Sequence, residues 1–156
     1  MFVQATLTLA AAGDYGADDV LSESATVGEA TSLAFNLAGR ERFSIKSMRI
    51  TSSVTTQTWK GELWLLRETP HDDTVVDDNV AFSLAIEDRL KVAAVLLMGS
   101  AMRDVGEIAY GEQVFDPPVD VELGDGETAL YAILVTTDAF TDESAGQTVT
   151  IELDAA

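Results

Sequence analysis

TVTIELD, residues 148–154, alternates apolar and polar side chains along its whole length. Because successive side chains of a β-strand point to opposite faces, Val149, Ile151 and Leu153 share one side, and the threonines and acids share the other. This pattern is typical of a strand that buries one face. The same alternation recurs in FVQATLTL (2–9), SLAFNL (32–37) and VDVEL (119–123). The sequence therefore predicts several half-buried strands around one core.

Two further stretches are apolar at consecutive positions, which is the pattern of a central strand covered on both faces. These are ELWLLR (62–67) and ALYAILV (129–135), and we expect their Trp64 and Tyr131 to lie in the core. Their second face needs a cover, either from another segment of the chain or from a neighbouring subunit. In FSIKSMRI (43–50) the apolar parity changes partway, which predicts a β-bulge near Ser47.

The segment DDNVAFSLAIEDRLKV (77–92) fits both the strand and the helix period. We expect one or two short helical turns within residues 77–91, capped by Asp77 or Asp78. Elsewhere the strand patterns recur between Gly-, Pro- and Asp-rich turns, without a long helical period. The fold class predicted is all-β: a two-sheet antiparallel β-sandwich, with the jelly roll among its types, forming one domain over residues 1–156.

Charge and composition exclude several classes of protein. The chain has 9 Lys and Arg against 27 Asp and Glu, a net charge of −18, so its surface repels phosphate and we expect no direct nucleic-acid binding. The acid excess fits either a protein that is simply very soluble or a protein adapted to function at high salt concentration. No cysteine is present, and the longest apolar run, 92–99, is far shorter than the roughly 20 residues of a membrane-spanning helix. We expect no signal peptide and no membrane association.

The stretch GELWLLRETPHDDTVVDDNVAF (61–82) holds the one histidine of the chain, His71, among acids. A lone histidine without cysteine makes a poor zinc or catalytic site, and no nucleophile or nucleotide-binding motif occurs. We therefore expect no enzyme, no catalytic residue and no cofactor. The calcium candidates are Asp72, Asp73, Asp77 and Asp78, although the spacing of a calcium-binding loop is missing. We expect instead that residues 67–79 form a solvated crossing between two strands, and calcium binding is the alternative.

Three side chains are candidates for contact with a partner: Trp59, His71 and Tyr110. Exposed aromatic rings stack on sugars or anchor protein interfaces. Rim loops such as the one around His71 are also common recognition sites.

Several stretches, in one order along the chain, resemble small β-sandwich proteins from the heads of tailed bacteriophages, which decorate the capsid. They are GDYGADDVLSE (13–23), GELWLLRETP (61–70), DDNVAFSL (77–84), EDRLKVAAVL (87–96) and ALYAILVTTDAFTDESAGQTVTIEL (129–153). The resembling stretches are spread over residues 13–153 and include no active-site motif, so they assign no residue a role.

The resemblance implies a structural virion protein, a capsid decoration or cement protein that binds the assembled capsid and stabilises it. Its partner would be the major capsid protein, and it would form a homo-oligomer, with a trimer favoured. It would be made in the host cytoplasm and reside on the capsid exterior. The alternative function is a carbohydrate-binding or adhesin-like β-sandwich, assisted by calcium, in which Trp59, Tyr110 and acidic loops bind the sugar.

Overall fold

The computed structural model describes residues 1–10, 13–37, 39–55, 57–142 and 146–156. Within these residues the chain forms twelve β-strands and one short 3-10 helix, η1, and no helix is long and apolar enough to cross a membrane. The elements in chain order are β1 (Phe2–Thr8), β2 (Gly13–Tyr15), β3 (Val20–Leu21), β4 (Leu33–Asn36), β5 (Arg42–Ser52), β6 (Gly61–Leu66), η1 (Ile86–Asp88), β7 (Val92–Leu97), β8 (Arg103–Asp104), β9 (Ala109–Glu122), β10 (Ala129–Thr136), β11 (Phe140–Asp142) and β12 (Thr148–Ala155).

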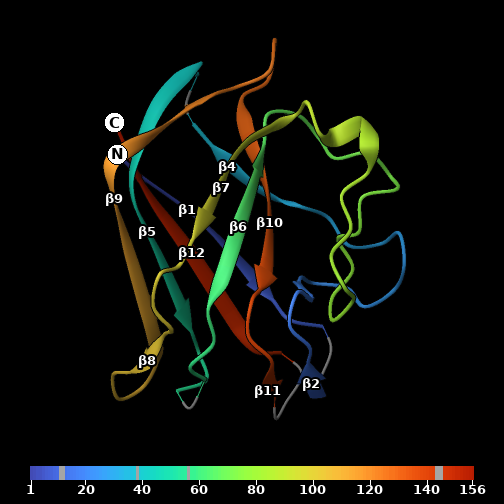
Figure 1. The fold of residues 1–156 in the computed structure, drawn as a ribbon, viewed down its shortest axis with the longest axis vertical. Coiled ribbons are helices and arrows are strands. Elements are labelled where there is room, and N and C mark those ends of the chain that lie inside the picture. The colour runs from blue at the N-terminus through green and yellow to red at the C-terminus, as the bar shows by residue number, and fades with distance from the viewer. Residues whose placement is uncertain (11–12, 38, 56, 143–145) are drawn as a thin grey trace.

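Two large sheets face each other as a sandwich (Figure 1). The first has the strand order β1-β12-β5-β9-β8, and the second has the order β3-β10-β6-β7, with β4 also paired to β10. All pairings between these strands are antiparallel. A small third sheet joins β11 to β2. The predicted two-sheet antiparallel sandwich is confirmed.

The connectivity is that of a jelly roll. Counted in chain order, the eight principal strands are β1, β4, β5, β6, β7, β9, β10 and β12. If these eight strands are numbered 1 to 8, the order in the first sheet is 1-8-3-6, and the order in the second sheet is 2-7-4-5. This alternation of long crossings between the sheets is the doubled Greek key of a jelly roll.

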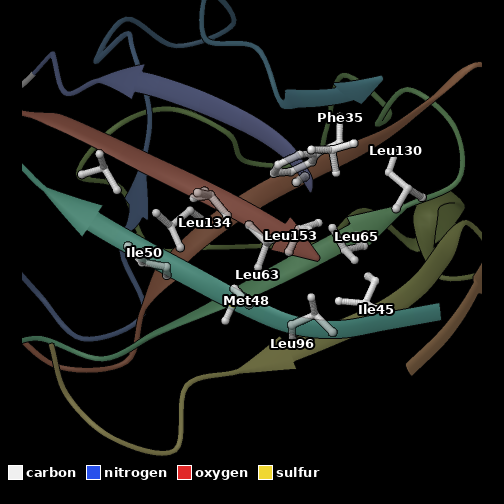
Figure 2. Close-up of a cluster of buried hydrophobic side chains, with 14 of the residues drawn as sticks. Phe35, Ile45, Met48, Ile50, Leu63, Leu65, Leu96, Leu130, Leu134 and Leu153 are labelled. Carbon is white, nitrogen blue, oxygen red and sulfur yellow. The ribbon is translucent and has the colours of Figure 1, made fainter. Parts of the chain in front are cut away.

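The core lies between the sheets and consists of the side chains that the alternating patterns predict. Val149, Ile151 and Leu153 of β12 are fully buried, and the inward side chains of residues 2–9, 32–37 and 119–123 join the same cluster. Figure 2 shows how leucines, isoleucines, Phe35 and Met48 from both sheets interdigitate there. Burial of each such side chain stabilises the fold by roughly 1.5–3 kcal/mol before entropy costs are counted.

The predicted bulge in β5 is also confirmed. The register of β5 against β9 shifts between Ile45 and Ser47. Because of this shift, Phe43 and Ile45 before the bulge and Met48 and Ile50 after it all point into the core.

Part of the outer face of the second sheet is covered by a segment of the same chain. Inward side chains of β10 and β6 enter the main core, whereas Ile133, Val135 and Leu66 form a second cluster on the outer face. The segment between β6 and β7, residues 67–91, lays four apolar side chains over this cluster: Val75, Val76, Phe82 and Leu84. Trp64 and Tyr131, expected in the main core, belong to this second cluster and are half-buried. We call residues 67–91 the covering segment.

A helical turn forms within residues 77–91, as predicted, but its length and its cap differ from the prediction. One 3-10 turn forms, but it spans only Ile86–Asp88, and Ala85 occupies its cap position without a side-chain hydrogen bond. Asp77 and Asp78, the expected caps, are used elsewhere. The helical spacing of Phe82, Ile86 and Leu90 also misleads, because only Phe82 packs inward, against Trp64.

Candidate interaction surface

The covering segment is held in place by carboxylates that accept backbone hydrogen bonds. Asp78 is 1% exposed, and its carboxylate accepts hydrogen bonds from the Ser22 N–H at 2.9 Å, the Ala10 N–H at 3.0 Å and the Tyr15 hydroxyl at 2.8 Å. Asp77, also buried, accepts one from the Gly28 N–H at 3.0 Å. Buried carboxylates are tolerated when donors surround them in this way. These two acids therefore attach the covering segment to the loops around residues 10 and 22–28.

A second fixation point is Asp88, which is fully buried at the end of η1. Its Oδ2 accepts hydrogen bonds from the His71 N–H at 2.7 Å and from the Thr74 hydroxyl, and its Oδ1 lies 2.9 Å from the Lys91 ammonium. The Thr74 hydroxyl in turn accepts the Ala85 N–H at 2.9 Å. Both ends of the covering segment are thus tied to one buried side chain.

The pKa of Asp88 reflects this arrangement. Burial alone would raise the pKa of its carboxyl, but the hydrogen bonds from Thr74, Lys91 and the His71 N–H outweigh burial and hold the pKa below its ordinary value. Asp88 is therefore ionised across the physiological pH range, and its ion pair with Lys91 persists there.

This fixed frame presents two apolar side chains to solvent. Ile86 is 68% exposed and Leu90 is 92% exposed, one turn apart on and just after η1. Single exposed apolar residues are common on protein surfaces. Here, however, the buried Asp88 lies between them in the sequence, and its carboxylate is held by His71, Thr74 and Lys91. Ile86 and Leu90 are therefore displayed in a defined position, and we call them the apolar tip.

The calcium candidates do not come together. Asp72 and Asp73 are exposed to solvent, whereas Asp77 and Asp78 are buried against different loops. Within the described part of the chain, no three His, Cys, Asp or Glu side chains are grouped as a metal would require. The expected solvated crossing at residues 67–79 is correct for its first half only, since Thr74, Asp77 and Asp78 are buried.

His71 lies on the rim, as expected for a contact candidate, with its side chain 43% exposed. Its ring Nδ1 accepts the Asp73 N–H at 3.1 Å, and its own N–H donates to Asp88. The ring therefore closes a local turn, and its backbone belongs to the Asp88 network.

Trp59, the second contact candidate, is placed differently from the expectation: it is 1% exposed. Its ring stacks on Phe140 with a centroid distance of 5.3 Å, and Phe140 stacks on Tyr15 at 4.7 Å. Its Nε1 donates to the buried Gln57 side chain at 3.1 Å. A ring enclosed in this way cannot stack on a sugar or a partner in the folded protein, so Trp59 is a core residue.

Tyr110, the third candidate, lies half-buried on the open face of the first sheet. Its hydroxyl donates to Glu112 at 3.0 Å, and Arg49 bridges Glu112 and Glu152 with two contacts of 2.9 Å. Burial, reinforced by Glu112, raises the pKa of Tyr110, while Arg49 and Tyr110 together lower the pKa of Glu112. The guanidinium also lies 5.6 Å from the centre of the Phe2 ring. Tyr110 is therefore held in a network across four strands, its hydroxyl already engaged.

The apolar tip and Asp88 were not among the candidates that the sequence suggested. Leu90 stands between Arg89 and Lys91, and this polar setting was the available signal for an exposed leucine. Asp88 carried little local signal, because His71 and Thr74 lie 17 and 14 residues away and only Lys91 is near in the sequence.

Comparison with known proteins adds no family: no protein-family model matches the chain, and no curated protein does so either.

Proposed function

We propose that this protein is a structural virion protein of a tailed phage, a capsid decoration or cement protein that binds the assembled capsid surface and stabilises it. The observation that carries the proposal is the apolar tip. Ile86 and Leu90 are exposed, apolar and mounted on a segment fixed by the buried Asp88. Binding energy at protein interfaces is concentrated in a few residues, and a side chain on fixed backbone loses little freedom when it docks.

The fold agrees with this role by analogy only. Jelly rolls occur in viral capsid proteins and in lectins, among others. Fold does not determine function, so the analogy raises both virion and carbohydrate-binding roles without choosing between them. The apolar tip favours the virion role, since a protein partner offers the apolar pocket that such side chains fill.

In this proposal the partner is the major capsid protein, and the decoration protein sits on the capsid exterior as a homo-oligomer, a trimer being favoured. The net charge of −18 repels nucleic acid and favours a capsid surface with basic residues. Association should then become slower as salt screens the attraction.

The test uses purified capsids that lack the protein. Leu90→Glu places a charge in the apolar tip and is expected to weaken capsid binding about thirtyfold, the effect of losing roughly 2 kcal/mol at an interface anchor. The matched control is Val27→Glu, since Val27 is also apolar and 82% exposed but lies outside the covering segment. Equal binding by the two variants would refute the role of the apolar tip, and no binding by the wild-type protein would refute the capsid role.

The oligomeric state is tested separately, by light scattering at low and high salt. A closed trimer agrees with the proposal. A monomer under every condition contradicts the homo-oligomer and leaves capsid binding to be judged by the first experiment.

A further inference from the structure

A groove of about 550 Å³ lies at one end of the sandwich, away from the apolar tip residues. It is formed where β5 begins, β9 ends and the chain leaves β6, near the labelled chain ends in Figure 1. Its polar lining comes from Arg42, Ser44, Arg67, Asp120 and Glu122. This volume falls within the range of small-molecule sites, about 300–1,000 Å³.

The polar side chains of the groove are arranged as neighbouring donors and acceptors. Arg42 donates to Glu122 at 3.0 Å, and the Ser44 hydroxyl bonds to Asp120. Each carboxylate has further lone pairs for additional donors, and each guanidinium has further N–H groups for additional acceptors. The two arginine and two acidic side chains cancel in charge, and Ala156 completes the lining, with its oxygen accepting the Ser44 N–H at 2.9 Å.

Arg67 is the unsatisfied member of this set. Its Nε is buried and has no hydrogen-bond partner among the residues that the structure describes. A buried donor left unpaired destabilises a folded protein, so such a group calls for an explanation. Because Arg67 lines the groove, a ligand hydroxyl bound there is a candidate acceptor for its guanidinium.

The chemistry of the lining selects the class of ligand. A dianion would be repelled by Asp120 and Glu122 in the groove and by the net charge of −18 on the whole protein. A cation would meet Arg42 and Arg67. A neutral molecule rich in hydroxyl groups avoids both penalties, because each hydroxyl donates to a carboxylate and accepts from a guanidinium at the same time. Phe43 and Val121 also line the groove, but each is only 5% exposed, so a bound sugar would be held mainly by the polar side chains.

We propose that this groove binds a neutral saccharide, with Arg67, Asp120 and Glu122 holding its hydroxyl groups. The site is distinct from Trp59 and Tyr110, and it stands independently of the capsid role, since none of its residues belongs to the apolar tip.

The experiment titrates the ¹⁵N-labelled protein with glucose, galactose, mannose and N-acetylglucosamine and follows backbone amide shifts. Acetate and succinate serve as anionic comparators. We expect saturable binding of at least one sugar in the millimolar range, with the largest shifts at Ser44 and Val121. Asp120→Asn and Arg67→Gln should each weaken it about tenfold, the loss of one charged hydrogen bond. The matched control for Asp120→Asn is Asp73→Asn, which makes the same change in net charge at an exposed site outside the groove.

Three results would overturn the proposal. They are the absence of saturable binding by any of the four sugars, shifts that map outside the groove, and tighter binding of acetate or succinate than of every sugar. Since the shift map is made on the wild-type protein, the proposal can be refuted even if a variant fails to fold. Unchanged binding in both folded groove variants would also place the sugar elsewhere.

Discussion

The attachment of the covering segment through Asp78 can be tested by removing its carboxylate. In Asp78→Ala the Ser22 N–H and the Tyr15 hydroxyl, both belonging to buried residues, lose the acceptor they have in the native protein. Ala10 is affected less, because it is exposed and its N–H also lies 3.3 Å from the Ser22 carbonyl oxygen. Among the described partners of Asp78, the cost of the substitution therefore comes mainly from two buried donors.

The expected magnitude follows from these two donors. Each unsatisfied buried donor costs roughly 1–3 kcal/mol, so Asp78→Ala should lower the free energy of unfolding by about 4 kcal/mol. That is a large share of the roughly 5–15 kcal/mol that stabilises a typical domain. For a chain of this size each kcal/mol moves the melting temperature by about 2–4 °C, so we expect Tm to fall by roughly 10 °C. Asp78→Asn keeps one oxygen acceptor and should cost about half as much.

Urea unfolding followed by tryptophan fluorescence measures the effect, with the melting temperature as a second readout. Asp73→Ala is the matched control, since the Asp73 side chain is 80% exposed and its loss should change the stability by less than about 0.5 kcal/mol. If Asp78→Ala proved as stable as Asp73→Ala, the buried carboxylate would not be what holds the covering segment.

Two further predictions concern stability. The pKa of Asp88 lies below its ordinary value in the folded protein, so its contribution is fully present above the unfolded pKa of about 3.9 and is lost as pH falls through the folded value. In urea titrations from pH 7 to pH 2, Asp88→Asn should therefore show a smaller loss of stability than the wild type, and parallel curves would contradict the assignment. Gly61→Ala should cost roughly 1–3 kcal/mol, because the added methyl group would lie 2.9 Å from the buried Trp59 ring and 3.2 Å from the Val135 carbonyl oxygen. Gly99→Ala meets only the flexible Gln113 side chain, so thermal melting should show a much smaller change, and the reverse order would refute the packing argument.

The half-buried strands were predictable because their signal is local. In TVTIELD the period of two fixes which side chains are buried, and the bulge near Ser47 follows from the break in parity alone. The jelly roll was only one of the sandwich types that these strands allowed. Its strand order depends on pairings such as β1 with β12, which join opposite ends of the chain.

The candidate site was less predictable, because identical residue types play different roles there. Asp73 and Asp78 are both members of Asp-Asp pairs, yet only Asp78 meets donors from Ala10, Tyr15 and Ser22, which precede it by 56 to 68 residues. For the same reason, the sequence predicted Trp59 to be exposed and Trp64 to lie in the core, whereas Trp59 is buried and Trp64 is half-buried. The ring of Trp59 is buried by Phe140, far away in the sequence.

The buried acids of the covering segment change what the composition of this protein means. An excess of surface carboxylates commonly keeps a protein soluble. Asp77, Asp78 and Asp88 are instead buried and accept hydrogen bonds from backbone N–H groups of loops and turns. The N–H groups of Ser22, Gly28 and His71 should therefore exchange with deuterium slowly although they belong to loops and turns. These hydrogen bonds order the covering segment in the free protein. The conformational entropy of the segment is therefore lost during folding and not when a partner docks.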